Sequence, residues 1–386
     1  MSENSDQVVF FGNNGWNEIS SYLDTHGINS ILLVTGRDMF SDSGAKEKLS
    51  PIFEGKNVTR VSDFETNPKV EDIQSILDSL PVDMNYDAII AVGGGSVMDV
   101  SKLIKAYANS NLPVVDCIHG NEPLTPAVIP LIAVPTTAGS GSEATHFAVV
   151  YHGQEKFSIA HEALRPNVAV VIPSLLESLP SNIAAASGMD ALCQGIESYW
   201  SIYSTGQSRA TAKEAITLAW GSLKEAVLEK SPRSLDNISR SSHLAGRAIN
   251  LTKTTAPHAV SYALTTFYGV LHGHAVGLLV PHFFAYNASV SETDCLDPRG
   301  SIWVNTTLQE IAELLGCASP SEVRDAMLGL MKTINLETDI GKLGVINAND
   351  IEVVVKNGFN PQRVNNNPRQ LTEEALRDLL TEMISV

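Results

Sequence analysis

The sequence predicts an α/β domain with a parallel sheet, followed by an all-helical domain. Between residues 29 and 134, short apolar runs alternate with stretches whose apolar residues have helical spacing. Such alternation is typical of a parallel sheet covered by helices on both faces. From about Ser174 onward, almost every segment has helical periodicity. We therefore predict domains at residues 1–174 and 175–386, with the active site in the cleft between them.

The predicted elements of the first domain follow in order. Apolar runs bounded by glycine or polar residues indicate strands at 29–36, 58–61, 86–92 and 127–134. Helical spacing indicates helices near 43–49, at 70–80 and at 97–108.

The second domain is predicted from the same helical spacing. Its candidate helices are residues 175–185, 188–200, 207–228, 237–251, 274–285, 303–315, 320–334, 349–355 and 372–384. The polar stretch 201–207 and the Ser231–Pro232 pair mark loops between them.

Composition narrows the functional class. The chain has 386 residues, is 44% hydrophobic and 18% charged, and carries a formal net charge of −17. This acidity argues against nucleic acid or a membrane surface as a partner, although a pocket can still bind an anion through its local field. The polar N-terminus has no signal-peptide pattern and no run reaches membrane-spanning length, so we expect a cytoplasmic protein. The four scattered cysteines form no CxxC pair, which indicates reduced thiols.

A glycine-rich turn follows the third predicted strand. Gly93, Gly94, Gly95 and Ser96 end the strand and open a helix. Glycines let the backbone approach a ligand, and the free N–H groups of a helix start favour an anion such as a dinucleotide pyrophosphate. The spacing is not GxGxxG, so a plain tight turn is the alternative. One turn into the helix, Asp99 and Lys102 either bind ribose or phosphate or pair with each other.

A second turn, PTTAGSGSEAT at residues 135–145, follows the next strand. Its candidate ligand-binding residues are Thr136, Thr137 and Ser140. Two such turns at one sheet edge would form a nucleotide crevice, whereas an ordinary βα loop is the alternative.

Histidines are concentrated in an apolar stretch, residues 253–281, which contains His258, His272 and His274. Burying imidazoles is costly unless each finds a hydrogen bond or a metal. His258 shares a face with Tyr262 if the segment is helical. Gly269 and Gly273 would let His272 come from a turn. A metal site and a set of hydrogen-bonded core histidines both fit this pattern.

A carboxylate lies in a second apolar segment, residues 188–199. Asp190 and Gln194 are four apart and share a helical face. A buried carboxylate needs a cation, a metal or several donors. The alternative is a helix N-cap, where aspartate is favoured.

Four motifs together resemble the iron-containing (group III) alcohol dehydrogenase family. They are GGGSVMDVSK (93–102), PTTAGSGSEAT (135–145), GMDALCQGIESYWS (188–201) and the segment from His258 into HGHAVGLLVPH. The resemblance implies a dinucleotide-binding domain, a helical domain and a homodimer. It also implies a divalent metal, iron or zinc, which polarises an aldehyde or alcohol oxygen while hydride passes to or from nicotinamide. Lys156 resembles the family's cofactor-contacting lysine, with a solvated surface charge as the alternative.

The resemblance implies a metal site of Asp190, His258 and His272. The family usually has histidine where this chain has Gln194, and an amide oxygen is a weaker ligand than imidazole for iron or zinc. Tyr262 occupies a place where the family often has a further histidine, and its phenol would donate a proton to a nascent alkoxide or fill space. Without a metal, His258, Tyr262 or His272 would act as the acid.

The cofactor and the substrate are also predicted. Where NAD-preferring relatives carry aspartate, this chain has Gly36 followed by Arg37, which favours NADP over NAD, although Asp38 is close. The motifs look closest to the hydroxyethylphosphonate dehydrogenases, which reduce phosphonoacetaldehyde. Lys253 and Thr254, with Thr255, would hold a phosphonate. The further candidates Arg363 and Arg369 share with Lys253 the alternative of a solvated surface charge.

We therefore predict an NAD(P)-dependent alcohol dehydrogenase that reduces a small, anionic aldehyde. A lyase that resembles dehydroquinate synthase is a second interpretation, but it would need more basic and carboxylate groups around the substrate. A metal-free, non-catalytic nucleotide-binding homologue is a third, and Gln194 is the feature that favours it.

Overall fold

The computed structural model describes residues 7–81, 85–121 and 123–384 of the chain. They divide into two compact units, Met1–Leu179 and Pro180–Val386, and each is described by itself. Most of the N-terminal stretch on which the absence of a signal peptide was predicted lies outside the described residues.

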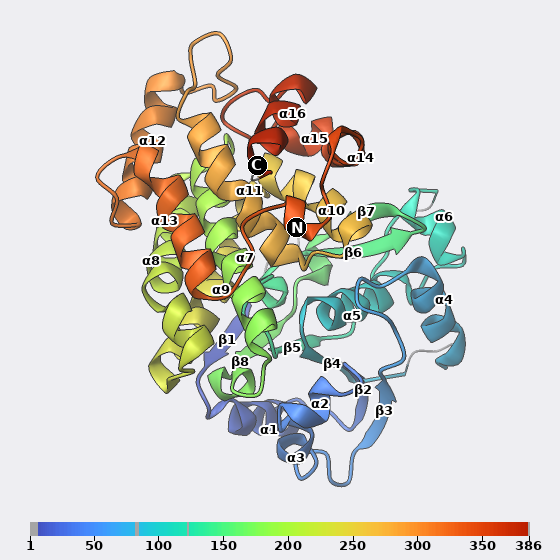
Figure 1. Ribbon diagram of the computed structural model, residues 1–386. Coiled ribbons are helices and arrows are strands. Elements are labelled where there is room, and N and C mark those ends of the chain that lie inside the picture. The colour runs from blue at the N-terminus through green and yellow to red at the C-terminus, as the bar shows by residue number, and fades with distance from the viewer. Residues whose placement is uncertain (1–6, 82–84, 122, 385–386) are drawn as a thin grey trace. The chain divides into compact units, whose positions relative to one another are not determined.

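The first unit is built on a six-stranded sheet with the order β1-β8-β5-β4-β2-β3, in which every pair is parallel (Figure 1). The strands are β1 (Val8–Phe11), β2 (Ser30–Thr35), β3 (Asn57–Val61), β4 (Ala88–Gly93), β5 (Leu131–Pro135) and β8 (Val168–Val171). A separate antiparallel hairpin consists of β6 (Phe147–His152) and β7 (Glu155–Ala160).

Both faces of this sheet are covered by helices because strand side chains alternate. On β2, Leu32 and Val34 belong to one apolar core and Ile31 and Leu33 to the other. The first core is completed by α4 (Val70–Ser79), α5 (Gly95–Tyr107) and α6 (Val114–Ile118). The second is completed by α1 (Gly15–Thr25), α2 (Met39–Asp42) and α3 (Ala45–Leu49).

The predicted parallel sheet is confirmed, and all four predicted strands belong to it. The prediction missed β1, β8, α1, α2, α6 and the β6–β7 hairpin. Strands β1 and β8 have four residues each and pair with each other.

The second unit is helical, as predicted. Its helices are α7 (Ser181–Trp200), α8 (Gly206–Leu228), α9 (Pro232–Thr252), α10 (Ala256–Tyr268), α11 (His272–Asn287), α12 (Ser301–Leu314), α13 (Pro320–Thr333), α14 (Ala348–Gly358), α15 (Pro361–Val364) and α16 (Glu373–Glu382). Two corrections follow. Where two helices were predicted at 175–185 and 188–200, the structure has a short 3₁₀ turn, Pro173–Leu176, followed by the single helix α7. Helix α10 was not among the predicted helices.

Helix α7 is the core of this unit. It packs against α8, α9, α11 and α12, and from Gly188 to Trp200 every residue is buried. A helix that is covered all round presents any polar side chain to other protein groups, and α7 carries several.

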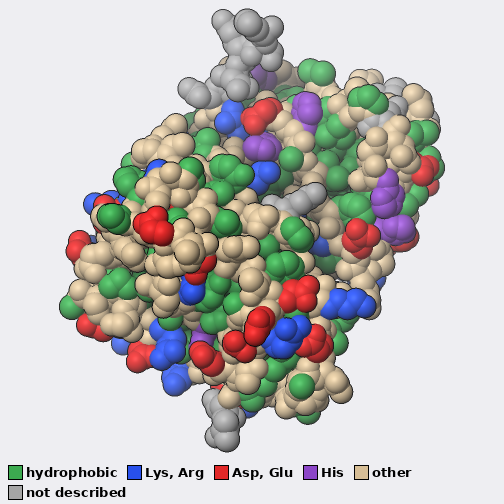
Figure 2. All heavy atoms as spheres, turned by 90° about the horizontal axis from the view of Figure 1, so that it is seen from above, with side chains coloured by type: hydrophobic (Ala, Val, Ile, Leu, Met, Phe, Trp, Pro, Cys, Tyr) green, Lys and Arg blue, Asp and Glu red, His purple; other side chains and the backbone are tan. Residues whose placement is uncertain are grey.

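On the face shown in Figure 2, acidic and basic side chains are interspersed among apolar ones. Among the described residues, no helix has both the length and the apolar character needed to cross a bilayer.

Candidate metal centre and nucleotide-binding turns

Helix α7 presents three buried polar side chains along one face. Asp190, Gln194 and Glu197 follow one another at intervals of four and three residues, which is the spacing of a single helical face. Asp190 is the tenth residue of the 20-residue helix, which begins at Ser181. The alternative interpretation of Asp190 as a helix N-cap is therefore wrong.

Two histidines meet Asp190 from other helices. His258 lies in α10 and His272 is the first residue of α11. Asp190, His258 and His272 each offer one ligand atom, and these atoms all lie within 4.8 Å of one another. His258 Nε2 is 3.2 Å from Asp190 Oδ1, and the two imidazole rings are 5.4 Å apart. Three predicted ligands thus form one cluster.

A glycine lets α11 approach α7 closely enough for His272 to lie near Asp190. A Cβ atom on Gly273 would lie 2.0 Å from the carbonyl oxygen of Ala186 and 2.8 Å from Cβ of Asp190. No side chain larger than hydrogen fits there, so the start of α11 touches the backbone of α7. Gly269 ends α10 in the left-handed conformation, and the short link after it leads to His272.

Glu197 holds His258 from the side opposite the cluster. It is fully buried, and its Oε2 is in contact with Nδ1 of His258. Its Oε1 accepts from the backbone N–H of Thr255 at 3.0 Å and from the Thr255 hydroxyl at 2.8 Å. This arrangement fixes the ring so that Nε2 faces Asp190, as carboxylates do for metal-binding histidines. Sequence reasoning missed Glu197, although its position seven residues after Asp190 was a signal.

The charges in this cluster support one another. Burial raises the pKa of Asp190, but the hydrogen bond with His258 and the nearby His272 outweigh that and hold the pKa below its usual range. Burial lowers the pKa of His258, but Glu197 and Asp190 outweigh that and raise it. The Asp190 carboxylate is therefore ionised, which suits a cation at the centre.

A polar atom without a protein partner points to a ligand here. Gln194 donates a hydrogen bond to Asp190. Its Oε1 is buried, and no group in the described part of the chain donates to it. A buried acceptor without a partner is costly unless a water or a metal fills the place. One carboxylate, two imidazoles and an amide oxygen form a donor set that fits iron or zinc.

Replacing Gln194 with histidine is expected to raise metal affinity and leave the order of preference among aldehydes unchanged, because imidazole is the stronger ligand. Metal content after dialysis, measured by mass spectrometry, checks the first expectation, and turnover of an aldehyde panel checks the second. Unchanged metal retention in Gln194→His would contradict a ligand role for this position.

The other aromatic residues of this region have distinct roles. The Tyr262 ring stacks on His272, with centroids 5.4 Å apart and planes 10° from parallel, and its oxygen accepts from Arg363. His274 lies apart from the cluster, where Nε2 meets the carbonyl oxygen of Glu337 at 2.7 Å. The core-histidine interpretation thus applies to His274.

The predicted substrate residues follow α9. Lys253 is exposed, and Thr254 is half-buried with its carbonyl oxygen bonded to Asn366 Nδ2 at 3.0 Å. Among the described residues, neither side chain contacts the cluster of Asp190, His258 and His272. Their substrate role stays a prediction. Arg369 is an ion-pair partner of Asp294 at 2.7 Å, so its charge is already matched.

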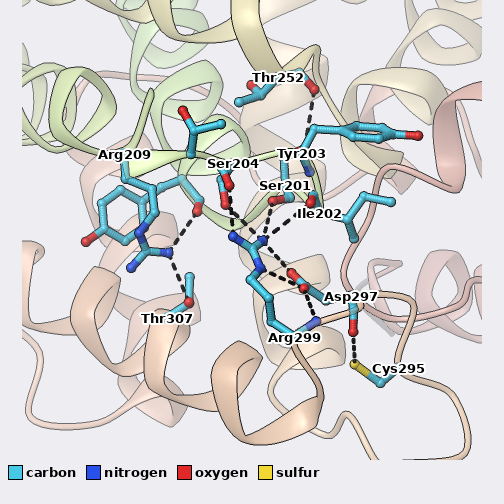
Figure 3. A network of polar contacts seen from close by, with 12 residues as sticks. Ser201, Ile202, Tyr203, Ser204, Arg209, Thr252, Cys295, Asp297, Arg299 and Thr307 are labelled. Atoms are coloured by element: carbon cyan, nitrogen blue, oxygen red, sulfur yellow. Dashed lines mark hydrogen bonds and ion pairs between the residues drawn. The ribbon is translucent and has the colours of Figure 1, made fainter. Parts of the chain in front are cut away.

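A network around Arg299 holds the loop that follows α7 (Figure 3). Arg299 binds the Asp297 carboxylate through Nε at 2.8 Å and donates to the Ser204 carbonyl at 2.8 Å. The Ser201 hydroxyl then donates to the carbonyl of Thr252 at 3.3 Å. The end of α7 is thereby fixed to the end of α9, just before the segment that carries His258.

The first unit brings the two glycine-rich turns together. Strands β4 and β5 are neighbours, with Gly93 opposite Pro135, and the Thr136 N–H donates to the Gly93 carbonyl at 3.0 Å. A Cβ on Gly94 would lie 3.1 Å from Thr137, and one on Gly95 would lie 3.2 Å from the Ser140 hydroxyl. Ser96 is the next residue in α5, and its hydroxyl accepts from the Asn67 N–H.

Lys102 and Asp99 interact with other protein groups of this unit. Lys102 is fully buried, and its ammonium donates to the Ser142 carbonyl at 2.7 Å and to Thr145 and Phe147. It therefore fixes the second turn to α5 and is occupied by protein acceptors. Burial raises the pKa of Asp99 to about 6 against the opposing charges of Lys102 and Lys156, which places Lys156 beside the same group.

Two arginines lie near the end of β2, where the sequence predicted a preference for NADP over NAD. Arg37 forms an exposed ion pair with Asp63. Arg60 donates to the Thr35 hydroxyl at 2.9 Å and to the Gly36 carbonyl at 3.1 Å. Sequence reasoning missed Arg60, because it lies 24 residues beyond Gly36 and is brought there by the β2–β3 pairing.

The chain is similar to known aldehyde reductases and alcohol dehydrogenases. The chain is 36% identical over 310 residues to phosphonoacetaldehyde reductase from Streptomyces viridochromogenes, covering 77% of this chain and 76% of that one. It is 29% identical over 374 residues to alcohol dehydrogenase 4 from Saccharomyces cerevisiae, covering 95% and 94%. Sulfoacetaldehyde reductase from Bifidobacterium kashiwanohense, solved in complex with NAD+, superposes with a TM-score of 0.87 at 29% identity, covering 98% and 97%.

Two family models cover almost the whole sequence. The iron-containing alcohol dehydrogenase model matches residues 6–173, and the C-terminal model of the Fe-containing alcohol dehydrogenase family matches residues 184–384. The chain therefore belongs to the iron-containing alcohol dehydrogenase family of oxidoreductases.

Proposed function

We propose that this enzyme is a metal-assisted, NAD(P)H-dependent reductase of small anionic aldehydes, with phosphonoacetaldehyde as the candidate substrate. The observation that carries the proposal is the cluster of the buried Asp190 and His258 with the half-buried His272, together with the unpartnered Gln194 oxygen. In this proposal residues 1–174 bind the dinucleotide and residues 175–386 bind the metal and the substrate.

The dinucleotide pyrophosphate is proposed to bind at the turn Gly93–Ser96. The first N–H groups of α5 face out of the helix start without intrahelical partners, and glycines leave room for the phosphate oxygens. Thr137 and Ser140 line the same turn and offer hydroxyl donors. Asp99, Thr136 and Lys156 act behind this surface by fixing its shape and charge.

Four side chains are proposed to hold the metal: Asp190, Gln194, His258 and His272. When bound there, iron or zinc would supply Lewis-acid chemistry, polarising the aldehyde oxygen while nicotinamide supplies hydride to the carbonyl carbon. Glu197 keeps the His258 ring oriented with Nε2 toward the cluster. Tyr262 delivers the proton that completes the alcohol, because His272 is occupied as a ligand.

The choice between NADP and NAD is proposed to favour NADP. Gly36 offers no carboxylate to a ribose hydroxyl, and Arg37 and Arg60 carry positive charge to this end of the sheet. Asp63 partly neutralises Arg37, so Arg60 is the better candidate for a 2′-phosphate. The related sulfoacetaldehyde reductase was solved with NAD+, so NAD is the alternative.

The substrate proposal draws on two relatives. One is named for phosphonoacetaldehyde and the other for sulfoacetaldehyde, both short aldehydes with a tetrahedral anionic group. Lys253 and Thr254 stay candidates for binding that group. A cytoplasmic homodimer is proposed from the family resemblance.

The test is NADPH oxidation by purified enzyme with phosphonoacetaldehyde, before and after treatment with a chelator and after restoring iron or zinc. We expect turnover that the chelator abolishes and one of the two metals restores. Absence of aldehyde-dependent NADPH and NADH oxidation would contradict the proposal and favour the lyase or the non-catalytic homologue.

A further inference from the structure

We propose that Arg363 binds the anionic group of the aldehyde and so makes the enzyme select aldehydes that carry a phosphonate or sulfonate. This inference rests on the proposed function and assigns its substrate selectivity to one side chain. It does not depend on Lys253 or Thr254.

Arg363 and His272, a member of the Asp190–His258–His272 cluster, both contact the side chain of Tyr262. Arg363 lies in α15 and is half-buried, and its Nη1 donates to the Tyr262 hydroxyl oxygen at 2.9 Å. The guanidinium carbon is 5.2 Å from the centre of the Tyr262 ring. That ring stacks on His272, a member of the cluster, with centroids 5.4 Å apart. The side chain of Tyr262 is thus in contact with both Arg363 and His272.

The charge of Arg363 is unmatched within the described part of the chain. Other arginines of this unit have carboxylate partners: Arg209 pairs with Glu310, Arg299 with Asp297 and Arg369 with Asp294. The recorded polar partner of Arg363 is a neutral phenol, and no carboxylate among the described residues lies within ion-pair distance of it. A guanidinium has five N–H donors, so several stay available for an anion.

This environment suits a tetrahedral oxyanion. A guanidinium matches two oxygens of a phosphonate or sulfonate with parallel hydrogen bonds, and partial burial strengthens each of them. A two-carbon aldehyde of this class holds its anionic group one methylene away from the carbonyl carbon. With the carbonyl at the cluster, the anionic group therefore falls close to Tyr262, the side chain that Arg363 also contacts.

A purely structural role for Arg363 makes a different prediction. If it only supports Tyr262, and through it His272, its loss would impair reduction of all aldehydes to the same extent. If it binds the anion, its loss would impair anionic substrates selectively. The ratio of kcat/KM for an anionic to a neutral aldehyde of similar size separates the two roles.

The experiment compares the wild type with Arg363→Gln on phosphonoacetaldehyde, sulfoacetaldehyde and propionaldehyde. We expect the anionic-to-neutral ratio of kcat/KM to fall about 100-fold, the effect of losing a charge-assisted contact. Arg363→Lys should recover part of it, because it keeps the charge but not the paired donors. The matched control Arg369→Gln removes an arginine of the same segment whose charge Asp294 already matches, so its ratio should equal that of the wild type. The two anionic aldehydes show whether phosphonate or sulfonate is preferred.

A binding measurement keeps this test independent of turnover. Ethylphosphonate carries the anionic group without a carbonyl, and calorimetry should show that Arg363→Gln binds it at least tenfold more weakly than the wild type or Arg369→Gln. Arg363-dependent binding without turnover would leave the inference standing and overturn the proposed function. An unchanged ratio in Arg363→Gln, an equal loss on all three aldehydes, or ethylphosphonate binding that is absent from the wild type or unaffected by Arg363→Gln would overturn the inference.

Discussion

Replacing Asp190 with alanine is expected to remove the metal and to lower kcat/KM for aldehyde reduction about 1,000-fold, which corresponds to about 4 kcal/mol of transition-state stabilisation. Asp190 is the one carboxylate among the clustered ligand atoms, and its Oδ1 lies 3.2 Å from His258 Nε2. Without it, two imidazoles and an amide would have to hold a divalent cation with no charge to neutralise it.

Two measurements are needed, metal content by mass spectrometry and turnover with added iron or zinc. The matched control is Asp236→Ala, which removes a helical aspartate whose half-buried pairing with Arg240, four residues away, is worth little. Circular dichroism and thermal unfolding establish that both variants are folded. If folded Asp190→Ala keeps its metal and its turnover, the ligand assignment fails.

Replacing Glu197 with glutamine is expected to weaken metal binding about 10–100-fold, the usual effect of losing the group behind a metal-binding histidine. The substitution keeps the size of the side chain but removes its charge. Glutamine can accept bonds from Thr255 through its oxygen, but its NH₂ group would face His258 Nδ1. The imidazole would then lose the acceptor that fixes Nε2 toward Asp190.

The direct measurement is metal affinity from competition with a chelator of known strength, and Glu352→Gln, which affects an exposed pair with Arg377, is the control. A role confined to fold stability has a different outcome. In that case Glu197→Gln would unfold at lower temperature, while the folded protein would bind metal as tightly as the wild type.

The sequence predicted the central strands of the first unit because they are continuous apolar runs bounded by glycines. The central strands β2, β4 and β5 have this character, and the turns after β4 and β5 are visible as glycine and hydroxyl clusters. The edge strand β1 and the hairpin were missed because their residues are partly exposed and mixed in character. Their positions depend on pairing with distant strands, which local pattern does not reveal.

The cluster was predicted in part. Asp190, His258 and His272 were identified from motifs, and the structure brings them together. Glu197 was missed because it was not recognised as part of the polar face that Asp190 and Gln194 begin. For Lys102 the sequence left open cofactor contact or pairing with Asp99. Its ammonium interacts with the Asp99 charge and is bound by the second turn, a contact 40 residues away in sequence.

The most direct test of the central claim is a crystal structure of the enzyme with NADPH and zinc, with the metal located by its anomalous scattering. The account predicts a peak about 2.0–2.2 Å from Asp190, His258 Nε2 and His272. It also predicts nicotinamide C4 facing the same site, within about 3–3.5 Å of the position a carbonyl carbon would occupy. A metal bound elsewhere, or a nicotinamide ring directed away from these three residues, would contradict it.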